Sequence, residues 1–290
     1  MTEKRTGTQK GDTRLSYSSA ELLANCTQKY YHKKVLGTPI DSDIEQDQEA
    51  FNVGKAFHHV MEQSRHDKEP SLKQIKHACT VHEVEDKQAM IHAMSLKYFK
   101  LHKKLGLTCV ATEFEIANTI FLGYVDVILK DKSGNWWVTD LKTASTVSDT
   151  KLARLHSDTQ LNLYSRFQDH MAAMFKVDPK KFAGARYRVT TKSKIKPLKD
   201  EKYNSYVKRL FASVSSIDVE IPKESLNWEK AYKNHERLHS LSMALREGKI
   251  TPKQNFGYCD SYFKPCEYFS ACHGDTFTNL RDKLKVTDAD

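Results

Sequence analysis

Two aspartates and a lysine stand on either side of a predicted turn. Asp126 ends the stretch Gly-Tyr-Val-Asp, whereas Asp140 and Lys142 belong to the stretch Asp-Leu-Lys. Residues 132–135, Lys-Ser-Gly-Asn, are a typical turn sequence between segments rich in β-branched and aromatic residues, so we expect a hairpin. Residues whose numbers sum to about 266 then face each other, which places Asp126 opposite Asp140.

This pairing predicts a site for a divalent cation. Side chains directly opposite each other have Cβ atoms about 5 Å apart, and two like charges there are destabilising unless a cation lies between them. Strand alternation puts Lys142 on the same face as Asp140. Carboxylate oxygens suit Mg²⁺ or Mn²⁺, and a nearby ammonium group can orient water or stabilise charge on a phosphate. The pattern therefore indicates phosphodiester hydrolysis.

The alternative is an exposed hairpin whose charged side chains are solvated or form a surface ion pair. The apolar neighbours of the two aspartates disfavour it, because unpaired carboxylates are costly in such surroundings. These neighbours are Val125, Val127, Trp136, Trp137 and Val138.

The elements that must position these residues are predicted from periodicity and from capping signals. A β-type segment, residues 108–117, precedes the hairpin, so three consecutive antiparallel strands are the simplest arrangement. A further strand is expected at residues 183–191. The predicted helices span about residues 16–34, 46–65, 71–104 with a break near Thr80, 151–174, 203–217 and 226–247.

Four stretches, in this order, resemble the motifs of the RecB-type branch of the PD-(D/E)XK nucleases. They are Gly54–Glu62, Gly123–Asp126, Asp140–Lys142 and Gln160–Tyr164. Taken singly, such stretches have ordinary explanations, such as a core histidine or an amphipathic helix, and it is their shared order and spacing that favours the family. The resemblance implies an α/β fold with a central mixed sheet flanked by helices, the PD-(D/E)XK nuclease core. A helical N-terminal part and a cysteine-stapled C-terminal segment would complete it.

The resemblance also implies a metal site and a role for each of its side chains. The expected metal ligands are His58, Asp126, Asp140 and the main-chain carbonyl of Leu141. Lys142 would position or activate the water for in-line attack, and the released strands would carry a 5′-phosphate.

Two further pairs of residues complete the expected active site. On the strand before Asp126 the family often has an assisting carboxylate, and we expect Glu113 to supply it, with Glu115 as the alternative. Gln160 and Tyr164 are four residues apart and share a helix face, so both could bind the DNA backbone.

The cysteines predict a second metal centre. Three of them form the pattern Cys259-x6-Cys266-x5-Cys272, and Cys26 on the first predicted helix could supply a fourth thiolate. Some RecB-type nucleases hold a [4Fe–4S] cluster in this way, although the gap between their first two C-terminal cysteines is commonly shorter. Zinc is the alternative ion, with His273 as a possible substitute ligand, and three reduced thiols without a metal are the simplest alternative. Cys79 and Cys109 stand alone and are expected to be buried structural thiols.

Composition places the chain among soluble globular proteins. It has 46 Lys and Arg against 37 Asp and Glu, a net charge of +9, which favours a polyanionic partner such as DNA without excluding a merely basic protein. No apolar run is long enough to cross a membrane, and the N-terminus lacks a signal peptide, so we expect the cytoplasm, of a bacterial or phage-infected cell. The expected domains are a disordered tail (1–15), a nuclease domain (16–250), a cysteine-rich metal-binding segment packed on the first helix (251–280) and a second tail (281–290).

These observations predict a stand-alone, phage-like exonuclease that uses Mg²⁺ or Mn²⁺. It would act on DNA ends or single strands in replication, recombination or repair, with replication or recombination proteins as further partners. The alternative is a nucleic-acid-binding protein that kept the fold and lost turnover, which a broken catalytic set would reveal. All the expected side chains are present.

Overall fold

The computed structural model describes residues 12–41, 48–259 and 265–274. The chain divides into two compact units. The terminal unit comprises Met1–Asp47, Ala117–Leu122 and Lys233–Asp290, and the sheet unit comprises Gln48–Ile116 and Gly123–Tyr232. The domain boundaries expected from the sequence stay predictions, and most of both predicted tails and part of the cysteine-rich segment lie outside the described residues.

A five-stranded mixed sheet has the strand order β1-β2-β3-β4-β5. Strands β2 and β3 are antiparallel, β3 and β4 parallel, and β4 and β5 antiparallel. Val127 pairs with Thr139, which confirms the predicted hairpin register. The strands are β1 (Thr108–Ala117), β2 (Leu122–Lys130), β3 (Trp136–Ala144), β4 (Phe182–Thr191) and β5 (Ser216–Pro222).

Helices make up most of the other regular structure in the described residues. The α-helices are α1 (Tyr17–Asn25), α2 (Thr27–Tyr30), α3 (Gln48–Gln63), α4 (Leu72–Val81), α5 (Gln88–Leu105), α6 (Asp149–His156), α7 (Thr159–Ser165), α8 (Gln168–Phe175), α9 (Tyr203–Ser213), α10 (Trp228–Arg246) and α11 (Phe269–His273). The short turns are the π-helical η1 (Tyr31–Leu36) and the 3₁₀-helical η2 (Glu85–Lys87), η3 (Pro179–Lys181), η4 (Lys223–Ser225) and η5 (Phe256–Tyr258).

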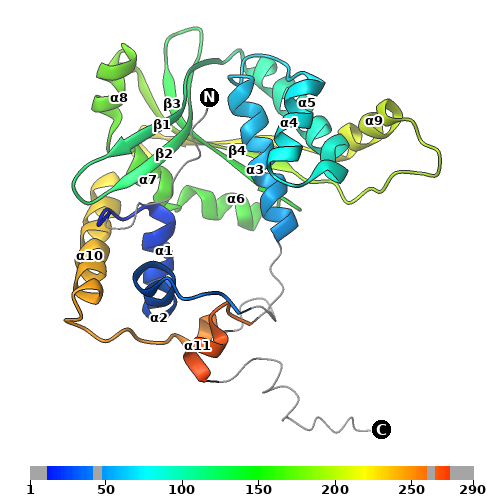
Figure 1. Cartoon of the computed structure of the whole chain (residues 1–290). Coiled ribbons are helices and arrows are strands. Elements are labelled where there is room, and N and C mark those ends of the chain that lie inside the picture. Colours follow the sequence, from blue (N-terminus) through cyan, green and yellow to red (C-terminus); the bar gives the residue numbers. More distant parts are fainter. Residues whose placement is uncertain (1–11, 42–47, 260–264, 275–290) are drawn as a thin grey trace, which may run out of the picture. The chain divides into compact units, whose positions relative to one another are not determined.

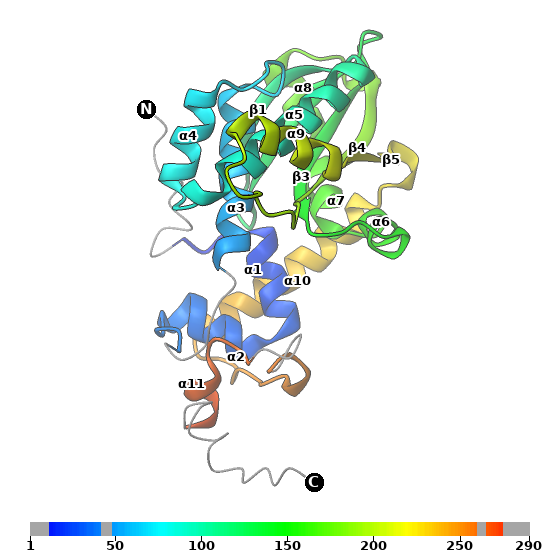
Figure 2. The same ribbon diagram turned by 90° about the vertical axis from the view of Figure 1, so that its right-hand side faces the viewer.

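Helices α3, α4 and α5 cover one face of the sheet, and α7 packs on the other (Figure 1, Figure 2). Leu141 of β3 joins the core that Val53, Phe57, Ile75 and Tyr98 of these three helices form. Its neighbours Asp140 and Lys142 point to the opposite face, where Gln160 of α7 contacts both. The predicted α/β fold with a mixed sheet and flanking helices is therefore confirmed.

Three predicted elements differ from those observed. The helix expected at 151–174 is broken into α6, α7 and α8, because Asp158 leaves the helix to cap α7, its carboxylate accepting a hydrogen bond from the Gln160 N–H at 2.7 Å. The helix expected at 16–34 breaks at Cys26, whose backbone is extended. The helix expected at 203–217 ends at Ser213, and β5 follows. Strand β5 was missed although apolar and polar residues alternate through its seven residues, because the helical pattern before it was extended to residue 217, into the start of the strand.

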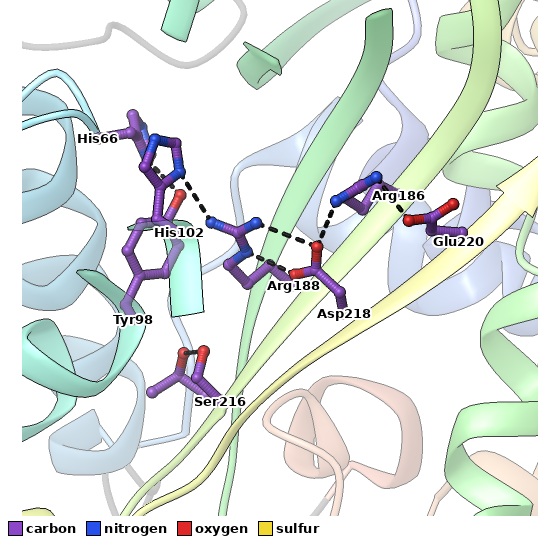
Figure 3. A network of polar contacts seen from close by, with 9 residues as sticks. His66, Tyr98, His102, Arg186, Arg188, Ser216, Asp218 and Glu220 are labelled. Carbon is purple, nitrogen blue, oxygen red and sulfur yellow. Dashed lines mark hydrogen bonds and ion pairs between the residues drawn. The ribbon is translucent and has the colours of Figure 1, made fainter. Parts of the chain in front are cut away.

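A buried polar network fixes β4 and β5 to α5 (Figure 3). Arg188 is fully buried and donates two hydrogen bonds to Asp218, 2.6 and 3.0 Å long. On its other side the Arg188 guanidinium lies 3.2 Å from Nδ1 of His102 and packs over the ring of Tyr98. Buried charges are tolerated only when they are paired in this way, so the network specifies how the helix and the two strands meet.

The terminal unit has its own small core. Its apolar residues include Leu15, Leu23, Tyr30, Leu238 and Leu245. The Tyr30 hydroxyl lies 2.6 Å from Oγ of Ser242, which ties the first helices to α10. Among the described residues, no helix is long and apolar enough to span a membrane.

Candidate active site

The two predicted aspartates lie on β2 and β3 and are almost fully buried, with 8 % of Asp126 and 3 % of Asp140 exposed. Oδ2 of Asp126 accepts a 2.7 Å hydrogen bond from the Leu141 N–H and lies 3.6 Å from Nδ1 of His58. The structure therefore brings the histidine of α3 to the hairpin, as the sequence predicted.

Gly54, one turn before His58, explains how α3 comes so close to the sheet. A Cβ atom at this position would lie 3.2 Å from Oγ1 of Thr143 at the end of β3. Such a contact is tight, so an alanine at this position would require Thr143 or the helix to shift by a few tenths of an ångström.

Asp140, Lys142 and Gln160 form a closed ring of polar contacts. The Lys142 ammonium lies 2.8 Å from Oδ2 of Asp140 and donates a 2.7 Å hydrogen bond to Oε1 of Gln160. The Gln160 amide in turn donates to Oδ1 of Asp140 at 2.7 Å and to the Tyr164 hydroxyl at 3.2 Å. Gln160 and Tyr164 are buried, and Gln160 holds the side chains of Asp140 and Lys142 in place, whereas DNA binding by Gln160 and Tyr164 stays a prediction.

Glu113 completes a second group of ligand-type side chains. Each of three side chains offers one possible ligand atom, and these atoms lie within 4.8 Å of one another; the side chains are those of His58, Glu113 and Asp126. Glu113 has a φ of 49° within strand β1, an unusual conformation for a non-glycine residue. Glu115 instead accepts a 2.9 Å hydrogen bond from the Tyr124 hydroxyl. Of the two glutamates left open by the sequence, Glu113 is the one at the site.

The charges of these groups are strongly coupled. Burial raises the pKa of Asp140 above its usual range, the charge of Asp126 raises it further, and Lys142 only partly offsets the two effects. Burial also disfavours the charge of Asp126, yet His58 and the Leu141 N–H hold the pKa of this carboxyl below its usual value. Burial lowers the pKa of His58, but the Asp126 charge outweighs it and raises that pKa. The positive charges of His58 and Lys142 therefore only partly neutralise the negative charge of the carboxylates at the site.

A divalent metal ion fits this donor set. One imidazole and carboxylate oxygens from two strands, β1 and β2, converge, and the raised pKa of Asp140 on β3 indicates a carboxylate that gains from an additional cation. His58, Glu113 and Asp126 would hold the ion together with Asp140, whose present partners are Lys142 and Gln160. The carbonyl of Leu141 as a ligand stays a prediction.

One neighbour of the site was missed from the sequence. Tyr187 of β4 is Asp140's partner in the parallel pairing, and its ring centroid lies 5.6 Å from the Lys142 ammonium. No local pattern could have shown this, because parallel neighbours are joined by a long crossover and their register leaves no signal in the sequence.

Among the described residues, the four cysteines that were predicted to bind a metal do not form a compact metal site. No three of the thiols at positions 26, 259, 266 and 272 have sulfur atoms within 4.8 Å of one another, among the residues the structure describes. Burial raises the pKa of Cys272 to about 11, and the charges of the other three thiols raise it too. The side-chain amide nitrogen of Gln254 lies 3.3 Å from Sγ of Cys259 and 2.9 Å from Nε2 of His273.

The fold and the site define a class, the metal-dependent nucleases, and comparison with known proteins agrees. A sequence model of the PD-(D/E)XK nuclease superfamily matches residues 14–273. The chain belongs to the PD-(D/E)XK nuclease superfamily. Among solved structures, one described as the crystal structure of SSO0001 is 14% identical, with 81% of this chain and 90% of that chain covered, at a TM-score of 0.30. None of the curated proteins compared matches the chain.

Proposed function

We propose that the protein is a Mg²⁺- or Mn²⁺-dependent exonuclease that hydrolyses DNA at ends or along single strands, in replication, recombination or repair. The observation that carries the proposal is the convergence of His58, Glu113 and Asp126 beside the Lys142–Asp140 pair. A histidine and carboxylates that can hold a metal, next to an ammonium group, are what hydrolysis of a phosphodiester requires. The resemblance of the four sequence motifs to the RecB-type branch supports the choice of an exonuclease.

The side chains of the site would have separate roles in the reaction. A bound divalent ion supplies Lewis-acid stabilisation of the phosphate charge. The Lys142 side chain is 37 % exposed, so its ammonium can turn from Asp140 to the attacking water or to a phosphate oxygen. Gln160 contacts both Lys142 and Asp140 and limits where the ammonium can point. By the resemblance to the RecB-type nucleases, the released strands would carry a 5′-phosphate.

The competing proposal is a DNA-binding protein without turnover. It predicts binding of DNA that is indifferent to Mg²⁺ and leaves the strands intact. The complete set of catalytic side chains at the site supports the nuclease instead.

End-labelled DNA tests the proposal. The purified protein would be incubated with single- and double-stranded DNA labelled at the 5′ or the 3′ end, with Mg²⁺, Mn²⁺ or EDTA. We expect metal-dependent loss of the label from one end, in short products. Intact DNA under every metal condition, with binding preserved, would favour the competing proposal.

We further propose that Cys26, Cys259, Cys266 and Cys272 hold a metal centre, an iron–sulfur cluster rather than zinc. Sulfur atoms around one tetrahedral zinc ion lie roughly 3.8 Å apart, closer than any three of these thiols come, whereas a cluster of four irons spans a wider set. Lys253 and Asn255, which precede the three C-terminal cysteines, hydrogen-bond to Thr27 and Asn25 beside Cys26.

Iron, sulfide and zinc analysis of anaerobically purified protein tests the second centre. A brown protein with near-stoichiometric iron and sulfide is expected, together with loss of both on changing any one of the four cysteines to serine. Protein without iron or zinc, and with all six thiols titratable in the native state, would contradict it.

A further inference from the structure

A small cavity lies directly beside the catalytic lysine. Its volume is about 210 Å³, and the atoms that face it are apolar. The wall comes from the end of β3 and the loop after it, from α6 and from β4, with Lys142, Leu152, Leu155 and Val189 among its residues. The stem of Lys142 is shared by the cavity and the active site, so an occupant would lie next to the reacting phosphate.

The size and lining of the cavity restrict what can fill it. Pockets for drug-sized ligands begin at roughly 300 Å³, so this one has room for a single ring system and not for a base pair. Water is a poor occupant, because an apolar wall offers it no hydrogen-bond partners. A flat group with apolar faces is the best match.

Cations at the rim add a second requirement. Lys151 and Arg154 of α6 also line the cavity, and both are exposed. The Lys151 ammonium contacts only neutral oxygens of Thr146, at 3.2 and 3.3 Å. Within the described part of the chain, neither side chain forms an ion pair with a carboxylate. Apolar faces flanked by unneutralised cations match a nucleotide, with its base in the cavity and phosphates at the rim.

We propose that this cavity receives one unpaired nucleobase of the DNA strand being cut, while Arg154 and Lys151 bind neighbouring phosphates. A base that is paired and stacked in a duplex cannot enter, so the cavity makes the enzyme selective for single strands or for unwound ends. This inference rests on the proposed nuclease function. It adds that the substrate is single-stranded DNA or an unwound end rather than an intact duplex.

The first test uses the unmodified enzyme and changes the DNA. Single-stranded oligonucleotides would carry one abasic analogue, moved stepwise along the strand, and single-turnover cleavage would be measured for each. We expect one position, at a fixed distance from the cut, to slow cleavage roughly tenfold, because the abasic analogue loses the burial of a base against the apolar wall of the cavity. Equal rates at every position would overturn the proposal while leaving the nuclease function intact.

The second test fills the cavity and reads out binding without catalysis. Leu152→Trp places a large side chain in the cavity, and Ala153→Trp, at the exposed neighbouring position of α6, is the matched control. Fluorescence anisotropy in EDTA would compare labelled single strands with duplexes. We expect Leu152→Trp to weaken single-strand binding roughly tenfold and to leave duplex binding unchanged, with no effect of Ala153→Trp.

Equal single-strand affinity of Leu152→Trp and the wild type would contradict the proposal, even if no DNA is ever cut. If circular dichroism shows that Leu152→Trp does not fold, the binding test is repeated with the wild-type protein and single strands that carry the abasic analogue.

A third variant, Arg154→Gln, tests the cations at the rim of the cavity. Lys208→Gln of α9 is the control for the loss of one positive charge. Arg154→Gln should weaken single-strand binding, and Lys208→Gln should not. Equal losses of affinity in the two variants would show that Arg154 attracts DNA only non-specifically.

Discussion

Among the residues of the site, Asp140 is the carboxylate whose charge is least well stabilised, because burial and the charge of Asp126 raise its pKa despite Lys142. Asp140→Asn keeps the shape of the side chain and removes the like charge. In metal-free protein we expect the melting temperature to hold or to rise slightly. Cleavage should fall roughly 10³-fold, since metal-held charge contributes several kcal/mol to such reactions. Exposed Asp169→Asn on α8 is the control, and full activity of Asp140→Asn would remove this residue from the site.

Lys142→Met separates catalysis from binding. If the ammonium acts mainly on the transition state, single-turnover cleavage should fall roughly 10²- to 10³-fold, while the dissociation constant for uncut DNA changes little. The measurement pairs single-turnover rates with DNA binding in EDTA. A collapse of affinity with an unchanged rate at saturation would instead make Lys142 a phosphate anchor.

At this scale the sequence predicted the site well where a short-range rule applied. The period of two along a strand and the turn at 132–135 were enough to place Asp126, Asp140 and Lys142 together. They could not choose between Glu113 and Glu115, because residues two apart on a strand share a face, and Glu113 lies beside Asp126 while Glu115 contacts Tyr124 on the same strand. Lys151 and Arg154 gave no signal either, since surface cations on a helix are ordinary.

At the scale of elements, strand β1 holds a strained residue at the site. Glu113 has a φ of 49°, a conformation that costs a non-glycine residue roughly 1–2 kcal/mol. Because glycine avoids this cost, Glu113→Gly should be more stable than Glu113→Ala by about 1 kcal/mol in denaturant unfolding. Both variants should lose metal-dependent cleavage. Equal stabilities would show that β1 relaxes out of this conformation.

The elements were predicted in type more reliably than in extent. Helix α3 and the hairpin follow strong periodic patterns, and both formed as expected. Strand β5 is short, and the breaks around α7 depend on one capping residue, Asp158, so neither stood out from the longer helical patterns beside it. The order of strands β3, β4 and β5 rests on contacts far apart in the chain, which a single sequence does not reveal.

At the scale of the whole molecule, acid stability should depend on His66. Only 2 % of it is exposed, its Nδ1 lies 2.7 Å from the Tyr98 hydroxyl, and burial lowers its pKa to about 3 (Figure 3). In the unfolded chain a histidine has a pKa of about 6.5, so protons favour unfolding below that pH. The stability contributed by neutral His66 is present above pH 6.5 and is lost as the pH falls toward 3.

This histidine alone should lower the free energy of unfolding by about 2 kcal/mol between pH 7 and pH 5. His66→Asn removes that dependence, and asparagine tolerates the φ of 58° at this position. Urea unfolding at several pH values would compare its slope with that of exposed His77→Asn. Identical slopes for His66→Asn and the wild type would show that His66 titrates normally.

The most direct test of the central claim joins metal binding to cleavage. Mn²⁺ binding would be followed by electron paramagnetic resonance, and single-turnover cleavage of end-labelled single strands would be followed over the same Mn²⁺ concentrations. For the wild type we predict that both curves rise together, with no cleavage in EDTA, and that Asp140→Asn loses binding and cleavage in parallel. Cleavage that persists in EDTA, or that survives in Asp140→Asn while Mn²⁺ binding is lost, would contradict a metal-dependent nuclease built on Asp126, Asp140 and Lys142.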